Sequence, residues 1–422
     1  MMILTSAAVV SFCSPCPAET KLTKYTTRYY ILHTDLDRNL VREAVVRITA
    51  MAREYHNRTR SFAGRINTRF PFYLYKNRED YLRHPGVIQG SAGMFTGRSL
   101  VATAPRPGGS WRVVQHEGFH QFAHKMIAGH LPTWLDEGLA EYFGAGVWTG
   151  DSLVVGVISR HSLGRVRSMI DSKKFMPLEK MLDMKQTEWN DKLKTQNYLQ
   201  AWSMVHFLVH ADKGKYQPAL SSYIRDLSQG RSSSASFRKR FGKNVKAFQN
   251  RYTQWWSKLE DDPSSDLYDR IKVLTLTSFL ARAHYTRRKF ENIEAFFQAA
   301  RDGTFTRVFA EIGRRNPDIW LPESLLTRTV QRAGNIKQWS LVGKAKGLPR
   351  LKLARGGGAA LLGSFKMGSR ISVTVKTVRP VTKPASKPPV KTSIPHRLPG
   401  RFAKKTTLPL RYPVPLGSPQ LP

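Results

Sequence analysis

Three kinds of feature are scarce in this sequence. Of its 422 residues only Cys13 and Cys16 are cysteines, which excludes a fold held together by several disulfides. No run of about 18 apolar residues occurs, so a membrane-spanning helix is not expected. Acidic residues are few, because 30 Asp and Glu stand against 68 Lys and Arg, and the last of them is Glu323. The resulting net charge of +38 needs an explanation.

The excess positive charge is concentrated near the C-terminus. Residues 324–422 contain 20 Lys and Arg and no acidic residue, and 11 of the 24 prolines lie at 380–422. This composition predicts a disordered basic tail over residues 356–422. Such a tail could bind a polyanion, for example an acidic envelope glycan or an anionic lipid. Nucleic acid is not an expected partner, because no nucleic-acid-binding signature accompanies the charge.

The first residues are typical of an export signal. Residues 1–18 hold an apolar stretch followed by small residues and Pro17, and Ala18 suits the position before a cleavage site. No basic residue precedes that stretch, which is a departure from the usual signal peptide. We therefore expect a secreted or periplasmic, envelope-associated protein. Both cysteines would leave with the signal peptide.

The apolar patterns predict an α+β fold. Strands are expected at 27–33, 70–75 and 99–104, a helix at 35–55, and a turn at 91–97. From residue 111 onward the pattern is mainly helical, with Asp261-Asp262-Pro263 marking a boundary. The predicted parts are a signal peptide (1–18), an N-terminal α/β part of a catalytic domain (19–110), its helical part (111–260), a C-terminal helical domain (264–345) and the tail (356–422).

One motif carries most of the chemical information. His116 and His120 lie four residues apart, so on a helix their imidazoles are about 40° apart on one face and can bind one metal ion. Glu117 projects beside that ion, where it can act as a general base. Zinc is the expected ion for nitrogen and carboxylate ligands.

A second segment, Leu131 to Phe143, argues against a chance match of the HExxH motif. Thr133 is the expected N-cap of a new helix, with Asp136 in place of the usual capping-box Glu. Glu137 can supply the third ligand. Glu141, one turn later, can hydrogen-bond a ligand imidazole, and we expect His120 to be that partner.

These motifs resemble those of the gluzincins, the zinc peptidases of the thermolysin and aminopeptidase N type. The resemblance implies His116, His120 and Glu137 as ligands and Glu117 as general base. It also makes Ser99–Ala104 similar to the edge strand that aligns a peptide in that fold. Sixteen residues separate His120 from Glu137, a shorter spacing than in those two families, which fits the looser peptidase MA-like group better.

A longer pattern resembles a bacterial family of secreted proteins, domain of unknown function 1570. It consists of AGMF, HExxHQF, LPTWLDEGLAEYF and YLQAWSMVHFL, and it covers roughly Tyr25 to Trp256. The motifs are specific for the fold and the metal, and much less so for the substrate.

Other side chains are weaker candidates. Tyr198 is the first candidate for a donor that stabilises an oxyanion, and Tyr142 is the second. His124 continues the four-residue series, but a third helical His drifts away from the ion, so packing is the simpler interpretation. His206 and His210 lie on an apolar helix and are expected in the core.

Three functions remain open at this point. The first is a secreted zinc metallopeptidase acting on peptides or proteins, with Glu117 and Tyr198 as catalytic residues. Of the two modes of cleavage, we expect an endopeptidase rather than an exopeptidase. The second is a non-catalytic protein of the zinc-peptidase fold, attached to polyanionic envelope material through its basic tail. The third is a structural protein with a vestigial site.

Overall fold

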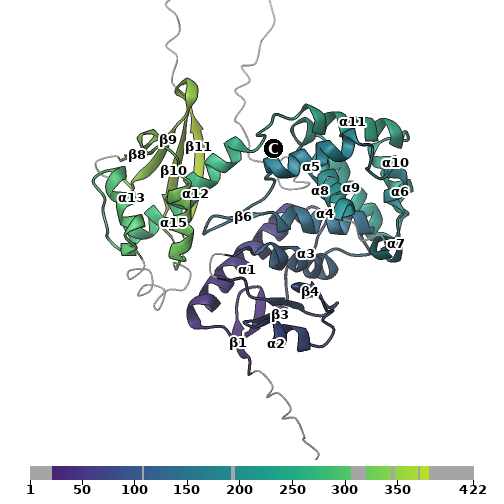
Figure 1. The fold of residues 1–422 in the computed structure, drawn as a ribbon, viewed down its shortest axis with the longest axis horizontal. Coiled ribbons are helices and arrows are strands. Elements are labelled where there is room, and N and C mark those ends of the chain that lie inside the picture. Colours follow the sequence, from purple (N-terminus) through teal and green to yellow (C-terminus); the bar gives the residue numbers. More distant parts are fainter. Residues whose placement is uncertain are drawn as a thin grey trace, which may run out of the picture.

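The computed structural model describes residues 21–106, 109–191, 195–305, 320–343, 347–368 and 371–379. The fold is mixed α+β, as predicted, with a small N-terminal sheet, a helical part and a C-terminal sheet (Figure 1). No helix within these ranges is long and apolar enough to cross a membrane. The predicted signal peptide and the tail beyond residue 379 lie outside the described residues.

The N-terminal sheet has five strands in the order β1-β2-β3-β5-β4. Its strands are β1 (Thr23–Thr26), β2 (Tyr30–Thr34), β3 (Phe70–Tyr75), β4 (Gly93–Phe95) and β5 (Leu100–Thr103). β2, β3 and β5 run parallel, whereas β1 and β4 pair antiparallel at the two edges. Alternate residues of β3 enter different cores, Phe72 the main core and Tyr75 a smaller one beneath α2 (Arg78–Arg83), as the period of two in a strand requires.

The edge strand differs from the prediction. Residues 99–104 do contain a strand, but β5 lies between β3 and β4 and is therefore interior. The edge is β4, which comes from the segment 91–97 that was expected to form a turn. A three-residue strand is too short to show an alternating pattern, so only its pairing with β5 reveals it.

Helix α1 (Arg38–Thr59) covers one face of this sheet. Its N-cap is Asp37, whose side chain accepts hydrogen bonds from the amides of Asn39 and Leu40, both at 3.1 Å. One stripe of the helix is buried, and its Tyr55 packs against the helix that carries the His-rich motif, with ring centroids 5.6 Å from Phe119. The helix thus supports the back of the candidate site.

The middle of the chain is helical, with one short hairpin. Its elements are α3 (Arg112–Met126), α4 (Thr133–Gly144), β6 (Val147–Trp148), β7 (Leu153–Val154), α5 (Arg160–Asp171), α6 (Leu178–Leu182), α7 (Gln186–Asp191), α8 (Thr195–His210), η1 (Ala211–Gly214), α9 (Gln217–Ser228), α10 (Ser233–Phe241) and α11 (Val245–Lys258). Helix α8 is buried from Ala201 to Val209 because the other helices surround it. The apolar helix that was predicted to carry His206 and His210 is therefore a central one.

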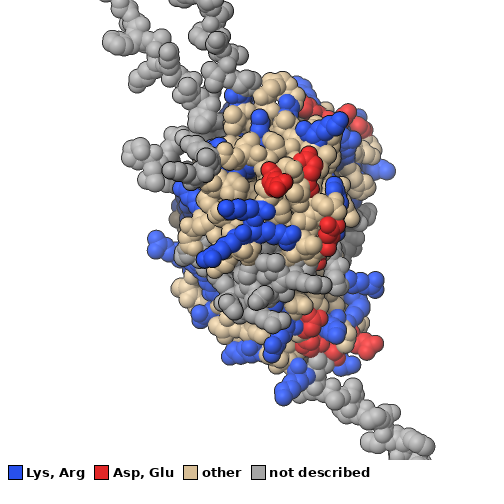
Figure 2. Space-filling view, turned by 90° about the vertical axis from the view of Figure 1, so that its left-hand side faces the viewer, with Lys and Arg blue, Asp and Glu red and all other residues tan. Residues whose placement is uncertain are grey.

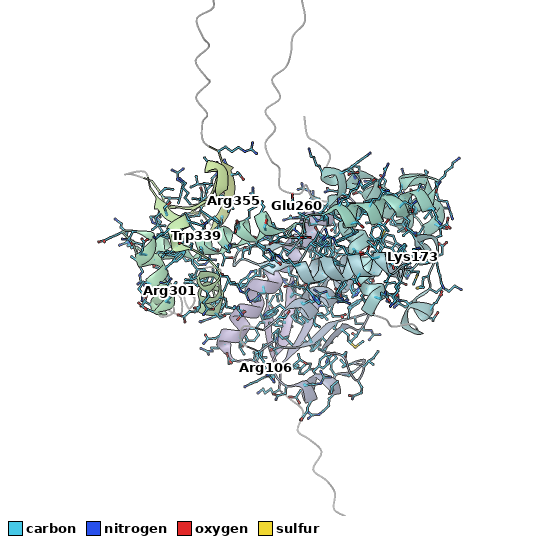
Figure 3. The ribbon with its side chains drawn as sticks, turned by 45° about the horizontal axis from the view of Figure 1, so that its top comes forward. Arg106, Lys173, Glu260, Arg301, Trp339 and Arg355 are labelled. Carbon is cyan, nitrogen blue, oxygen red and sulfur yellow. The ribbon has the colours of Figure 1, made fainter. Side chains whose placement is uncertain are left out.

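The C-terminal region pairs helices with an antiparallel sheet. It contains α12 (Ser265–Tyr285), α13 (Ile293–Arg301), α15 (Glu323–Gln331), η3 (Ile336–Gln338), β8 (Trp339–Val342), β9 (Arg350–Ala354), η4 (Gly356–Gly358), β10 (Ala360–Lys366) and β11 (Ser372–Val378), with strand order β11-β10-β9-β8. Trp339 is buried within this region, and Glu260 lies between it and the helical part (Figure 3).

Two predictions for this region are wrong. The region predicted to be helical at 264–345 ends in strand β8, and residues 356–379, predicted to be disordered, contain β10 and β11. The prolines and three consecutive glycines dominated the composition and hid the strands that follow. Leu361, Phe365 and Val375 are buried against α12, and that burial stabilises strands which could not fold alone.

Candidate metal centre

Helix α3 places two imidazoles on one face, one turn apart. The ring centroids of His116 and His120 lie 4.8 Å apart, and their Nε2 atoms face each other at 3.1 Å. The helix begins at Arg112 without a side-chain cap, and Gly118 lets α1 pack closely behind the histidines, because a Cβ there would lie 2.8 Å from the Cε of Met51. Local helix geometry and this close packing fix both rings.

Helix α4 brings a carboxylate to the same point. Oε2 of Glu137 lies 3.3 Å from Nε2 of His116 and 3.5 Å from Nε2 of His120. A tetrahedral zinc ion with bonds of about 2.0–2.1 Å separates its ligand atoms by about 3.3 Å. The three atoms therefore have the spacing of three corners of a zinc site. These are the three residues that the sequence predicts as ligands, and within the described residues they form a cluster suited to a metal ion.

The outer nitrogens of both rings are held by carboxylates. Nδ1 of His116 lies 3.2 Å from Oε1 of Glu141, and Nδ1 of His120 lies 2.9 Å from Oδ2 of Asp136. A neutral ring that donates its Nδ1 proton to a carboxylate presents a lone pair at Nε2. Oε2 of Glu137 is buried and accepts no hydrogen bond from the residues that the structure describes. Three lone pairs thus converge, and a cation fits between them.

The pairing of Glu141 differs from the prediction. We expected its partner to be His120, but it contacts His116, and Asp136 takes the place beside His120. The connection between α3 and α4 spans only residues 127–132, so the helices run back along each other and the later carboxylate meets the earlier histidine. This reversal is the signal in the sequence that could have found Asp136. Thr133 is not the N-cap either, since α4 is capped at Pro132.

The electrostatics of the cluster also favour a bound cation. Burial lowers the pKa of His116, but Glu137 and Glu141 raise it more, to about 9. Burial raises the pKa of Glu137, whereas the two imidazoles lower it to about 2. Positive charge is therefore stabilised at this point. A metal ion would compete there with the protons, because only neutral histidines ligate.

Glu117 lies beside the three candidate ligands and touches the edge strand. Its Oε2 accepts a hydrogen bond of 2.9 Å from the backbone amide of Phe95 in β4. Burial is the largest influence on its carboxyl group and raises its pKa. A carboxylate whose pKa is raised is a better proton acceptor at neutral pH, as a general base requires.

Strand β4 has main-chain groups available on the side of Glu117. Thr103 donates to Ala92, and Thr96 donates to Ser99, so these residues bond to the neighbouring strand. In an antiparallel pair the bonded residues alternate. The main-chain groups of Gly93 and Phe95 therefore point away from β5, toward the side on which Glu117 lies.

The tyrosine candidates differ in their surroundings. Tyr198, in α8, packs against Trp189 with ring centroids 5.5 Å apart. Burial, and next the negative charge of Glu137, raise its pKa, so its phenol stays protonated within electrostatic range of the cluster. Tyr142 is buried in the core instead, where its hydroxyl lies 3.1 Å from Nε2 of His210.

The three other histidines considered as candidates, His124, His206 and His210, are not part of the cluster of candidate ligands. His124 is exposed, and its ring packs on Phe95 at 5.3 Å. His206 and His210 are held in an aromatic cluster inside the helical part, with the ring of Trp202 4.3 Å from that of His206. The expectation that both belong to the core agrees with this placement.

In the comparison with known proteins, a family model matches a segment of the chain that includes the candidate metal centre. Residues 111–231 match the model of the family described as protein of unknown function (DUF1570). The match supports the DUF1570 family. It covers α3, α4 and α8, which is less than the span from Tyr25 to Trp256 over which the motifs resemble the family. No curated protein and no solved structure matches the chain.

Proposed function

We propose that this protein is a zinc-dependent metallopeptidase that hydrolyses peptide bonds. The observation that carries the proposal is the convergence of two Nε2 atoms and one orphaned carboxylate oxygen within 3.1–3.5 Å, with Glu117 adjacent. His116, His120 and Glu137 would hold the ion, and a fourth position is left for water or substrate, as in catalytic zinc sites.

A zinc ion at this point would polarise the scissile carbonyl and make a water molecule more acidic. Glu117 then accepts a proton from the attacking water and passes it to the leaving amine. Its hydrogen bond from Phe95 orients the carboxylate, so that one oxygen is held and the other is available for the proton. Tyr198 remains our candidate donor to the oxyanion.

The position of β4 supports a peptide as the substrate class. An extended peptide can add to an exposed strand edge through main-chain hydrogen bonds. The main-chain groups of Gly93 and the carbonyl of Phe95 can make such bonds, since the amide of Phe95 already donates to Glu117. The ring of Phe95 packs on the exposed ring of His124. A strand-like substrate bound there would pass directly over Glu117.

The first test replaces Glu117 by Gln and measures zinc stoichiometry together with digestion of a peptide library. We expect the variant to bind zinc like the wild type and to lose about 10²–10⁴-fold in rate, the usual contribution of general acid–base catalysis. Glu79→Gln, an exposed change in α2, is the matched control and should cleave normally. A Glu117→Gln variant that cleaves as fast as wild type would refute the proposal.

The alternative function, an envelope-bound protein that does not cleave, rests on the positive charge. Lys and Arg outnumber Asp and Glu on the face of the C-terminal region as well (Figure 2). The tail that would bind the polyanion lies outside the described residues, apart from 356–368 and 371–379, which contain η4, β10 and β11. Secretion, likewise, stays a prediction. Full zinc occupancy with no hydrolysis of any library peptide would favour this alternative.

A further inference from the structure

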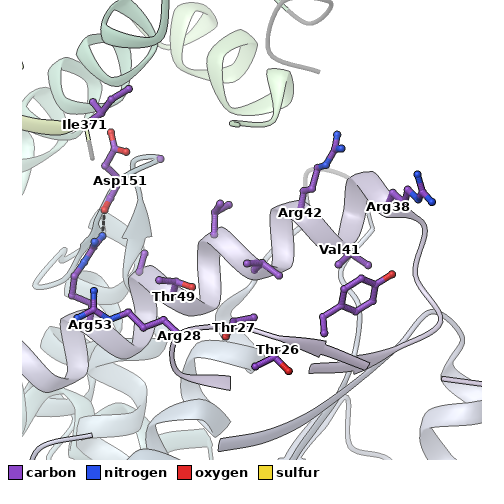
Figure 4. A pocket seen from close by; sticks show the side chains of 15 residues that line it. Thr26, Thr27, Arg28, Arg38, Val41, Arg42, Thr49, Arg53, Asp151 and Ile371 are labelled. Atoms are coloured by element: carbon purple, nitrogen blue, oxygen red, sulfur yellow. Dashed lines mark hydrogen bonds between the residues drawn. The ribbon is translucent and has the colours of Figure 1, made fainter. Parts of the chain in front are cut away.

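A cleft along helix α1 shares no residue with the candidate metal centre. It has a volume of about 690 Å³, within the range of small-molecule sites. Helix α1 forms its long wall, and β1 with the turn after it forms a second. The tip of the β6–β7 hairpin and Ile371, the residue before β11, close one end (Figure 4).

Arginines surround this cleft. The four that line it come from the turn after β1 and from one face of α1, and they are Arg28, Arg38, Arg42 and Arg53. Within the described residues, none of the four has an ion pair with a carboxylate. On the same helix, Arg47 pairs with Glu43 and Arg58 pairs with Glu54. The chain thus neutralises the arginines that face away from the cleft and leaves those at the cleft uncompensated.

The one acidic residue of the cleft is already engaged. Both carboxylate oxygens of Asp151 bind Arg282, at 2.8 and 3.2 Å, and one of them also accepts a hydrogen bond from Ser278. Arg53 reaches only the main-chain oxygen of Asp151. The cleft therefore keeps an excess of positive charge.

The wall of the cleft is apolar between the two ends. Its apolar residues come from α1, from β1 and from the residue before β11, and they are Tyr25, Val41, Val45, Val46, Ala50 and Ile371. In Figure 4, Arg28 and Arg53 lie together at one end of the helix, and Arg38 and Arg42 lie at the other. The hydroxyls of Thr26 and Thr49 add hydrogen-bonding groups, whereas that of Thr27 already bonds to the main chain of Tyr30.

We propose that this cleft binds an amphipathic phosphate, with the phosphate held by arginine and the apolar body lying along α1. Guanidinium groups bind phosphate oxygens in pairs, which suits two arginines at one end of a cleft. The basic tail at residues 380–422 does not compete for the site through a side chain, because it contains no Asp or Glu. The site is independent of the proposed peptidase activity.

The test measures binding of monomeric dodecyl phosphate by calorimetry, below the concentration at which it forms micelles. Wild type should bind it at least about tenfold more tightly than inorganic phosphate or neutral dodecyl maltoside, since each lacks one of the two interactions. Arg38→Ala/Arg42→Ala changes one end of the cleft and Arg28→Ala the other. The variant that weakens binding, by about tenfold or more, identifies the end that holds the phosphate. These arginines make no hydrogen bond to the described residues, so the variants should fold normally.

Lys243→Ala/Lys246→Ala is the matched control, because it removes the same charge from exposed positions far from the cleft. Equal weakening in the control and in the arginine variants would overturn the proposal, since binding would then follow net charge alone. Equal affinity for inorganic phosphate, or binding to phosphatidylglycerol vesicles without binding to the monomer, would overturn it too. Zinc content and peptide hydrolysis should not change in any of these variants.

Discussion

At the scale of single residues, two carboxylates decide how the histidines of the candidate metal centre are used. Asp136 and Glu141 each hold a ring at Nδ1, which turns Nε2 inward and fixes its lone pair. Glu141 is itself held by an ion pair with Arg112. The geometry of the three ligand atoms thus depends on residues that would never touch the ion.

Removing these carboxylates should weaken metal binding without removing a ligand. We expect Asp136→Ala and Glu141→Ala each to lower zinc affinity about 10–100-fold, as other losses of a ligand's hydrogen-bond partner do. Competition with a chromophoric chelator measures the change. Asp171→Ala, at an exposed position in α5, is the control. Unchanged affinity in both site variants would show that packing alone orients the rings.

The histidine His210, which packs against Tyr142 and His206, should make stability depend on pH. Burial, and next the charge of Arg58, lower its pKa from 6.5 to about 4. As the pH falls below 6.5, the unfolded chain takes up a proton that the folded protein refuses. The stabilising contribution is therefore complete above pH 6.5 and is lost between pH 6.5 and 4, by up to about 3 kcal/mol.

Urea unfolding across this pH range measures the effect. His210→Gln should unfold with a shallower dependence on pH between 6.5 and 4, whatever its stability at pH 7. His161→Gln, which changes an exposed histidine, should keep the wild-type dependence. The same slope in wild type and His210→Gln would mean that other groups control acid unfolding.

At the scale of elements, α4 is positioned between α3 and α8, and one glycine allows this. A Cβ at Gly138 would lie 2.6 Å from the main-chain oxygen of Ala201 and 2.8 Å from a methyl group of Val205. The close approach leaves no room for a side chain. Since Gly138 directly follows Glu137, the packing of α4 on α8 also sets the depth of the third ligand.

Gly138→Ala should therefore destabilise the protein, although alanine favours helices. We expect a loss of about 1–3 kcal/mol in unfolding free energy, typical of overpacking, together with weaker zinc binding. Gly164→Ala in α5 is the control, because its Cβ would meet nothing within 4 Å. That change should stabilise by up to about 1 kcal/mol. Equal stability of the two variants would contradict the role of the α4–α8 contact.

Elements whose pattern is local could be predicted from the sequence, and elements that depend on distant packing partners could not. The helices α3 and α4 and the strand β3 were predictable, because their apolar spacing and their charged residues are local. The strands β10 and β11 were not, since their apolar faces form only against α12. Gly363 illustrates this dependence, as a Cβ there would lie 2.0 Å from Oγ1 of Thr277 in that helix.

At the scale of the whole molecule, one buried ion pair joins the C-terminal region to the part that carries the metal site. Asp151, at the tip of the β6–β7 hairpin, binds Arg282 of α12, whose side chain is 1% exposed. At the same tip, Gly150 has a φ of 101° and lies against Leu321, where a Cβ would be 2.9 Å from a methyl group. The hairpin thus holds the C-terminal region through the Asp151–Arg282 ion pair and through the close packing of Gly150 on Leu321.

Breaking this ion pair should be costly. Asp151→Ala removes the carboxylate that pairs with the buried guanidinium of Arg282, and we expect a loss of about 3–5 kcal/mol in unfolding free energy. Arg160→Ala, which breaks an exposed pair with Asp262, should cost less than about 1 kcal/mol. Calorimetry compares the two. If Asp151→Ala costs no more than Arg160→Ala, the hairpin does not fix the C-terminal region through this pair.

The sequence by itself determined the groups that can hold a metal ion, because ligand type and a four-residue spacing on a helix are local properties. His116, His120, Glu117 and Glu137 were all predictable in this way. Only the tertiary structure decided which carboxylate holds which histidine, which strand forms the edge, and where the uncompensated arginines gather. These depend on the direction in which helices and strands return along one another, and residues distant in sequence set that direction through packing.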